Sequence, residues 1–321
     1  MKNIIKCMAA LMLCFCVMPL NAFARDLIPV GQVIGLELRD NTVTVAAFDE
    51  ELGAASKAAG LEIGDRILSI DGKQIQNAQD IRTALETSNG SVSVTIDRSG
   101  ARKTFRLTPA ITSDGPKLGL YLRQGVTGIG TVTYYDPENG AFGTLGHGVN
   151  NSSGALLTLS GGWAYRARVL TVRKGESGDP GQLMGAIESR TPVGKLTANT
   201  AQGVFGTTES GWQGQSVPVA DSDEIKTGRA VIRSTINGTE VREYSVEILK
   251  IYPKSRQNGR NLLIKVTDPE LLEATGGIVQ GMSGSPILQN GKLIGAVTHV
   301  LVNDPTTGYG IFIQNMLDAA A

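Results

Sequence analysis

Short apolar runs that end at glycine recur along almost the whole chain, and they limit the folds that it can adopt. Glycine accounts for 40 of the 321 residues, which is well above the ~7% that is usual in proteins. The chain has no G-X-Y period, which excludes a collagen-like triple helix, and its apolar content of 41% excludes low-complexity disorder. Because glycine adopts the positive φ angles that tight hairpin turns need, the pattern predicts a mainly β protein with many short strands.

The length and the charge of the chain narrow its organisation and its partners. A domain typically holds about 100–200 residues, so the length predicts two domains. Basic and acidic residues number 30 each, which gives a formal net charge of zero. Without a basic cluster the chain lacks the charges that neutralise phosphates, so nucleic acid is not an expected partner.

Residues 1–24 have the pattern of a signal peptide or of an N-terminal membrane anchor. Lys2 and Lys6 precede an apolar run that ends at Leu20, and Ala22-Phe23-Ala24 offers small residues to a signal peptidase. The run is close to the ~20 residues that a spanning helix needs, so both alternatives stay open. We therefore expect an exported protein, either secreted or held at the membrane by this segment.

The cysteines and histidines exclude several chemistries. Cys7, Cys14 and Cys16 all lie in the N-terminal segment, so the rest of the chain has no disulfide framework, thiolate zinc site or cysteine nucleophile. The two histidines, His147 and His299, lack the H-E-x-x-H spacing of zinc peptidases. We expect neither a metal nor another cofactor.

Residues 26–111 have the element order of a small domain of strands and two helices. Apolar runs at 32–38 and 42–48 precede a glycine-ended helix at 56–61, and a strand then leads to the Asp71-Gly72 turn. A second helix over 78–86 begins after the capping residue Asn77. A hairpin around residues 98–100 completes the pattern.

This order resembles a PDZ domain of bacterial secreted proteases, most specifically over residues 59–72. PDZ domains bind a peptide as an added strand and hold its carboxylate on backbone N–H groups of a glycine-containing loop. The resemblance implies that Val33, Ile34, Gly35 and Leu36 form this loop, which would take a peptide C-terminus or part of the same chain. The alternative is that Ile34 and Leu36 are core positions of a small β domain.

Residues 112–116 have the composition of a linker, and residues 114–321 form the predicted second domain. Short apolar runs and glycines continue through it, including strand patterns at 181–187 and 194–196, and only residues 269–275 and 315–319 have a helical pattern. About 200 residues of short strands are typical of a closed β structure or a pair of small barrels.

The segment Gly281-Met282-Ser283-Gly284-Ser285-Pro286 resembles the nucleophile loop of trypsin-like serine peptidases. A nucleophilic serine needs an exposed hydroxyl and a backbone that aims N–H groups at the developing oxyanion, and neighbouring glycines permit both. We therefore expect Ser283 to be the nucleophile and the N–H groups of Gly281 and Ser283 to line the oxyanion hole. Ser285 is the second choice of nucleophile, and a glycine-serine turn without chemistry is the alternative.

The order of the histidine and the serine favours the same class of enzyme. His147 lies between two glycines and precedes Ser283, as in trypsin-like enzymes, whereas in α/β-hydrolases the histidine comes last. His147 is therefore the expected general base. For His299, which follows the serine loop, we expect a partly buried histidine that is hydrogen-bonded to the backbone.

A third group, a carboxylate, should orient the histidine. Asp268 has a structural explanation of its own, because aspartate followed by proline is typical of a helix start. Spacing alone does not choose among the candidates, which are Asp114, Asp136, Asp179, Asp221, Asp223, Asp268, Asp304 and Asp318.

Four blocks of the second domain, at 143–148, 267–272, 276–286 and 295–310, together resemble the SpoIVB-type serine peptidases, the stage IV sporulation protein B family of endospore-forming bacteria. The resemblance implies an N-terminal PDZ domain followed by a trypsin-like β-barrel serine peptidase domain. It also implies His147, Asp268 and Ser283 as the catalytic triad, and so moves Asp268 from a helix cap to a triad member.

The same resemblance implies a biological role. Such an enzyme is exported across the forespore membrane into the intermembrane space, where it cleaves a membrane-associated regulatory protein. This releases an intramembrane protease that activates a late sigma factor. The PDZ domain of the family is tied to self-cleavage and substrate docking, but here the segment between the apolar run and the PDZ pattern is nearly absent.

Two other functions stay open from the residues alone. One is a non-catalytic scaffold that binds a partner through its PDZ domain. The other is a general quality-control PDZ protease, although in that group the protease domain usually precedes the PDZ domain.

Overall fold

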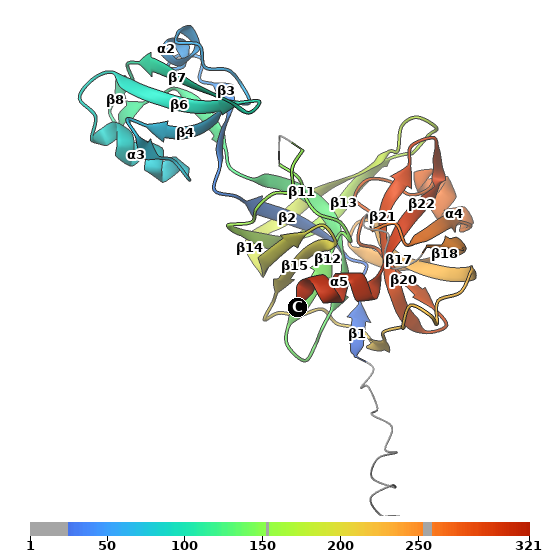
Figure 1. Ribbon diagram of the computed structural model, residues 1–321. Helices are drawn as coiled ribbons and strands as arrows, with labels where there is room; N and C mark the ends of the chain where they lie inside the picture. Colours follow the sequence, from blue (N-terminus) through green and yellow to red (C-terminus); the bar gives the residue numbers. More distant parts are fainter. Residues whose placement is uncertain (1–24, 152–153, 253–258) are drawn as a thin grey trace, which may run out of the picture.

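The protein consists of a small unit that stands apart from a larger unit of two β barrels (Figure 1). The structure is a computed structural model and describes residues 25–151, 154–252 and 259–321. The predicted signal or anchor segment lies outside these residues. Among the helices that are described, none combines the length and the apolar character that a membrane crossing requires.

The small unit, residues 43–123, is called the inserted unit below. Its main sheet has the strand order β10-β3-β4-β6-β7, and β5 pairs with β4. Its elements are β3 (Val43–Phe48), α2 (Ala54–Ala58), β4 (Arg66–Ile70), β5 (Lys73–Gln74), α3 (Ala78–Glu86), β6 (Val92–Arg98), β7 (Ala101–Leu107), β8 (Ala110–Thr112), β9 (Gly115–Lys117) and β10 (Leu120–Arg123).

Local signals explain why the elements of the inserted unit begin and end where they do. Asn77 caps α3 in a reciprocal capping box with Asp80, which satisfies two backbone N–H groups at the helix start. Asp71 and Gly72 both have positive φ, as the predicted tight turn requires. The helices and strands enclose a separate apolar core that includes Ile67.

The first barrel consists of six strands in the order β12-β15-β14-β13-β2-β11, and it closes because β11 also pairs with β12. β1 adds to the edge of β11, and β16 pairs with β1. The strands are β1 (Asp26–Pro29), β2 (Val33–Arg39), β11 (Val126–Tyr135), β12 (Ala141–Thr144), β13 (Gly161–Arg173), β14 (Gln182–Thr200), β15 (Gly203–Thr207) and β16 (Val217–Pro218).

The second barrel is closed in the order β17-β18-β19-β22-β21-β20, and the C-terminal helix α5 packs beside it (Figure 1). Its elements are β17 (Gly228–Asn237), β18 (Glu240–Ile251), β19 (Leu262–Val266), α4 (Pro269–Thr275), β20 (Pro286–Gln289), β21 (Lys292–Leu301), β22 (Asp304–Phe312) and α5 (Ile313–Ala320). The mainly β fold with closed barrels that the glycine pattern predicts is therefore confirmed.

The predicted first domain, residues 26–111, is wrong at both ends. Residues 26–39 form β1 and β2 of the first barrel, where Ile34 is paired with Gly130 of β11 on one side and with Arg166 of β13 on the other. The predicted linker at 112–116 is part of the β8–β9 hairpin, and the unit continues to β10. The apolar run at 32–38 fits either sheet, and its pairing partners lie far away in the sequence.

The inserted unit thus interrupts the first barrel between the neighbouring strands β2 and β11. The two connecting segments touch, because the Gln124 side chain donates to the Asp40 carbonyl (2.9 Å) and to the Gln76 carbonyl (3.1 Å). Gly125 has a φ of 81°, and a Cβ there would overlap the Leu38 carbonyl oxygen. Both connections are therefore short and closely packed.

Candidate active site

The predicted nucleophile loop connects α4 to β20 and lies on the first barrel. The Thr131 N–H of β11 donates to the Ser283 carbonyl (3.1 Å), and the Thr131 hydroxyl donates to the Gly281 carbonyl (2.8 Å). The Thr133 hydroxyl donates to the Gly284 carbonyl (2.7 Å). Since these bonds join the two barrels, the loop is fixed at the interface between them.

Two glycines let the loop adopt this shape. Gly281 has a φ of 100° and Gly284 a φ of 96°, and side-chain-bearing residues rarely adopt such angles. A Cβ on Gly284 would also overlap the Thr131 carbonyl oxygen. In the described part of the chain, the N–H groups of Gly281 and Ser283 donate to no acceptor. They are therefore free for the predicted role in an oxyanion hole.

The structure distinguishes the two candidate serines. Ser285 is fully buried and its hydroxyl donates to the Ser234 hydroxyl (3.1 Å) inside the second barrel. Ser283 is only partly buried, and its hydroxyl donates to the Thr298 carbonyl of β21 (2.9 Å). Ser283 is therefore the serine that a substrate can reach.

His147 follows β12 and lies in the same region of the interface. Gly146 has a φ of 68°, and a Cβ there would lie 2.8 Å from the Thr298 side chain, so the approach of β12 to β21 requires glycine. The His147 Nδ1 is 3.0 Å from the Gly148 carbonyl. Because a carbonyl can only accept, Nδ1 carries the proton and the lone pair is on Nε2.

Burial lowers the pKa of His147, and the hydrogen bond to Gly148 partly opposes this effect. The imidazole is therefore neutral at neutral pH, which is the form that can accept a proton. This is the protonation state expected of a general base.

His299 lies on β21 directly after Thr298, and its ring is close to that of His147. The two ring centroids are 5.2 Å apart and the ring planes are inclined by 40°. The His299 Nδ1 is buried and has no hydrogen-bond partner in the described part of the chain, so the expected hydrogen bond to the backbone is not made by this atom. Burial lowers the pKa of His299 to about 4, with smaller contributions from His147 and Arg260.

Asp268 caps α4, as its sequence pattern predicts. Its Oδ1 accepts from the Leu271 N–H and its Oδ2 from the Ser245 N–H, both at 3.1 Å. Within the described residues, no carboxylate forms a hydrogen bond or ion pair with His147, and none shifts its pKa. The contacts explain Asp268 as a helix cap, and its place in a triad stays a prediction.

The predicted carboxylate-binding loop of the PDZ domain is misplaced. Val33, Ile34 and Leu36 are buried, and β2 is paired on both edges, so no edge is free for an added peptide strand. The alternative interpretation of Ile34 and Leu36 as core positions is correct, although their core is that of the first barrel.

The main sheet of the inserted unit has two edge strands, β7 and β10, and in the described part of the chain β10 pairs only with β3. A groove of about 620 Å³ lies between β10 and α3, and its apolar lining includes Ile81, Leu85 and Leu120. The sequence carried a signal for it, since Leu118-Gly119-Leu120 repeats the apolar-glycine-apolar pattern of residues 34–36. Both segments have the same local pattern. Which of them forms the edge strand depends on pairing with strands far away in the sequence.

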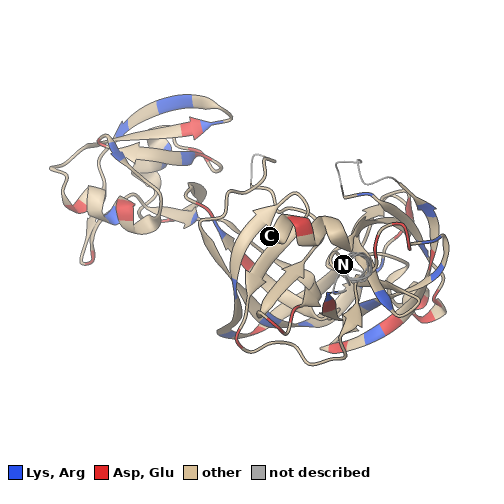
Figure 2. Cartoon of the chain, turned by 60° about the horizontal axis from the view of Figure 1, so that its bottom comes forward, with Lys and Arg blue, Asp and Glu red and all other residues tan. Residues whose placement is uncertain are grey.

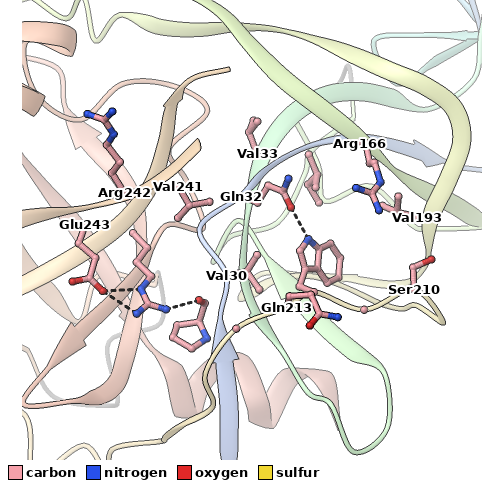
Figure 3. A pocket seen from close by; sticks show the side chains of 16 residues that line it. Val30, Gln32, Val33, Arg166, Val193, Ser210, Gln213, Val241, Arg242 and Glu243 are labelled. Atoms are coloured by element: carbon pink, nitrogen blue, oxygen red, sulfur yellow. Dashed lines mark hydrogen bonds and ion pairs between the residues drawn. The ribbon is translucent and has the colours of Figure 1, made fainter. Parts of the chain in front are cut away.

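A second cavity, of about 560 Å³, lies between the barrels and is lined by neither Ser283 nor His147 (Figure 3). Arg233 in its wall donates to Glu243 (2.9 Å) and to the Pro29 carbonyl (3.0 Å), and Trp212 donates to Gln32 (3.0 Å). The bond from Arg233 to Pro29 joins the second barrel to the first, so we interpret this cavity as part of the structural interface between the barrels.

Neither the distribution of charged residues nor the grouping of metal-ligating side chains indicates a further binding site among the described residues. Figure 2 shows acidic and basic residues interspersed on both units, in keeping with the zero net charge. Across residues 25–151, 154–252 and 259–321, no three histidine, cysteine or acidic side chains are grouped as a metal would require.

Comparison with known proteins assigns both units. The profile of the SpoIVB peptidase S55 family matches residues 114–317, and a PDZ domain profile matches residues 51–98. Proteins named as zinc metalloproteases from Bartonella henselae and Rhizobium meliloti are 31% identical over 84 residues and 34% identical over 100 residues. These matches cover 26% and 31% of this chain, and 23% and 26% of the relatives, so the chain spans about a quarter of their length.

Two solved structures are also similar in part. The PDZ domain of an SdrC-like protein from Listeria monocytogenes is 22% identical, with a TM-score of 0.22, over 26% of this chain and 87% of that one. The Rv3671c protease of M. tuberculosis is 15% identical, with a TM-score of 0.34, over 61% of this chain and 85% of that one. Since the peptidase profile covers more than half of the sequence, the chain belongs to the SpoIVB peptidase S55 family, with a PDZ domain inserted in its first barrel.

Proposed function

We propose that the protein is a serine endopeptidase in which Ser283 is the nucleophile and His147 the general base. One observation carries this proposal: the glycine loop with Ser283 is hydrogen-bonded to the barrel that presents His147, whose Nδ1 proton is fixed on the Gly148 carbonyl. The Nε2 lone pair is then available for the serine proton.

The reaction follows from these positions. The Ser283 hydroxyl leaves the Thr298 carbonyl, passes its proton to His147 Nε2 and attacks the peptide carbonyl carbon. The negative oxygen that forms is stabilised by the N–H groups of Gly281 and Ser283. His147 then gives the proton to the leaving amine, and water releases the acyl group from Ser283.

The PDZ domain supplies a second site for the polypeptide substrate. A peptide would add to the free edge of β10, with apolar side chains in the groove beside α3. The occupant is a peptide C-terminus or a segment of the same chain. This replaces residues 33–36 as the expected binding site.

The family supports a role in sporulation. We infer that the protein is exported across the forespore membrane, through the segment at residues 1–24, and cleaves a membrane-associated regulatory protein to trigger late sigma-factor activation. The support is the family profile over residues 114–317 and the sequence pattern of the N-terminal segment.

Labelling with a fluorophosphonate tests the catalytic proposal and separates it from a non-catalytic scaffold. We expect the full chain to be labelled, Ser283→Ala to lose labelling and peptide cleavage, and His147→Ala to lose both almost completely. Ser285→Ala is the matched control, because that hydroxyl is buried against Ser234. Retained cleavage by Ser283→Ala, or no labelling of the unaltered protein, contradicts the proposal.

A further inference from the structure

The side chain of Asn199, near the end of β14, holds the segment that follows His147. Its Oδ1 accepts from the Val149 N–H (2.9 Å), and its Nδ2 donates to the carbonyls of Val149 (2.8 Å) and Leu157 (2.7 Å). Because an N–H can only donate and a carbonyl can only accept, these partners fix which way the amide points. Asn199 therefore binds both backbone groups of Val149, as a neighbouring strand would.

One peptide group links this contact to the proposed base. The Gly148 carbonyl, which lies 3.0 Å from the His147 Nδ1, belongs to the same peptide group as the Val149 N–H. The peptide group is planar, so a rotation that moves one end also moves the other. Asn199 at the N–H end and His147 at the carbonyl end therefore belong to one chain of hydrogen bonds, in which each bond polarises the next.

A close backbone contact fixes the same segment from a second direction. A Cβ on Gly148 would lie 2.6 Å from the Thr200 carbonyl oxygen, so this approach to β14 requires glycine. β14 is paired with β13 and β15 of the first barrel, and its pairing with β15 includes both Asn199 and Thr200. The segment that carries His147 is therefore held against two neighbouring residues of a paired strand.

We propose that Asn199 is a positioning residue for His147: it holds the peptide group between Gly148 and Val149, so that the carbonyl keeps the imidazole oriented with its proton on Nδ1. Nε2 then stays free to accept the proton of Ser283, and Asn199 itself neither gains nor loses a proton. This inference rests on the proposed function of Ser283 and His147. It concerns the neutral base before the reaction, and Asp268 stays the predicted third member of the triad.

Nitrogen NMR of the imidazole rings in the full chain tests this inference. The chain has two histidines, so His147→Ala identifies the signals of His147. Burial lowers the pKa of both histidines, so both rings are neutral slightly above neutral pH. We expect His147 to be the Nδ1–H tautomer in the unaltered protein and a mixture of both tautomers in Asn199→Ala.

Peptide cleavage by Asn199→Ala measures the catalytic effect. We expect kcat to fall about 10- to 100-fold, as when a catalytic group is displaced by up to about 1 Å, and KM to change little. The loss in kcat and the change of tautomer should appear together, because both follow from the same movement of the Gly148 carbonyl.

Gln289→Ala is the matched control, because Gln289 makes the same set of bonds in the second barrel. Its side chain accepts from the Lys226 N–H (3.0 Å) and donates to the carbonyls of Lys226 (2.9 Å) and Arg229 (3.1 Å). Asn199→Ala and Gln289→Ala should therefore lose similar amounts of the free energy of unfolding. Only Gln289→Ala should keep both kcat and the tautomer of His147.

Gly148→Ala tests the same peptide group by a second route, and it is needed if Asn199→Ala does not fold. The added methyl group pushes the segment away from Thr200 while the Asn199 side chain is intact. We expect the same mixture of His147 tautomers and a similar loss in kcat.

Three results would overturn the inference: an Nε2–H tautomer in the unaltered protein, a folded Asn199→Ala that keeps kcat and the Nδ1–H tautomer, or an equal loss in kcat in Gln289→Ala. Full cleavage by Ser283→Ala or His147→Ala overturns the proposed function instead, so the two failures are distinguishable.

Discussion

Backbone groups, rather than other side chains, hold the polar residues of the site. The Ser283 hydroxyl donates to one carbonyl, the His147 ring to another, and Asp268 accepts from two N–H groups. This explains why sequence patterns identify the serine and the histidine but not the third group. The aspartate before a proline predicts its cap locally, whereas the neighbours of an imidazole depend on how two barrels pack.

Asp268 offers a test at the scale of a single residue. Asp268→Ala removes the acceptor of the Leu271 and Ser245 N–H groups, so we expect the free energy of unfolding to fall by about 1 kcal/mol. Asp268→Asn should lose less, because asparagine is a comparable cap. If Asp268 acts only as a cap, both variants keep kcat within a few-fold of the unaltered enzyme, whereas the predicted triad requires that both lose most of their activity. Denaturant unfolding and peptide cleavage measure the two effects, and a folded but inactive Asp268→Asn protein would show that the triad assignment is right.

Elements whose ends are set by local sequence signals begin and end where the sequence predicts. Elements whose extent is set by strand pairing do not. The helices at 78–86 and 269–275 begin and end as predicted, because Asn77, Asp268 and Gly276 cap them. By contrast, the strand pattern at 181–187 and 194–196 predicts two strands where the structure has the single long strand β14. Its pairing with β13 skips residues 188–191 and resumes at Pro192 with a shifted register, so the predicted break is an irregularity within one strand.

The loop that contains Ser283 gives a prediction at the scale of an element. Gly284→Ala introduces a methyl group that overlaps the Thr131 carbonyl oxygen, so the loop must move and the Ser283 N–H must leave its position. We expect kcat to fall by about 100-fold or more, which is typical when an oxyanion-hole donor is removed. Cleavage kinetics and thermal unfolding should be measured together.

Gly291→Ala is the control for this change. Gly291 also has a positive φ (77°), but a Cβ there meets nothing within 4 Å. Gly291→Ala should therefore lower the free energy of unfolding by about 1–3 kcal/mol, which is the strain that a side chain brings to this conformation, and should leave kcat unchanged. Equal kcat values in Gly284→Ala and Gly291→Ala would mean that the loop position does not govern the chemistry.

At the scale of the whole molecule, the PDZ domain is a separate body inserted into a barrel that is complete without it (Figure 1). Its apolar core lies between residues 43 and 118, and the cores of the barrels include none of these residues. Sequence order hides such an insertion, because β2 and β11 are neighbours in space and lie about 85 residues apart along the chain.

Removing the insertion tests this architecture. Leu38 of β2 pairs with Val126 of β11, so replacing residues 40–124 by Asn-Gly should join the two strands in a tight hairpin. We expect the shortened protein to fold and Ser283 to react with a fluorophosphonate at a rate close to that of the full chain. Cleavage of a protein substrate that docks in the β10–α3 groove should fall, while cleavage of a short peptide should not.

The same groove can be altered without shortening the chain. Leu120→Glu places a charge in the apolar lining beside the free edge of β10, so it should weaken docking as the deletion does and leave the barrels intact. If the shortened protein unfolds but Leu120→Glu cleaves short peptides normally and docked protein poorly, the PDZ domain supports the folding of the barrel as well as docking. If both variants cleave the protein substrate at the full rate, the groove does not present substrate to Ser283, and its occupant must be sought within the same chain.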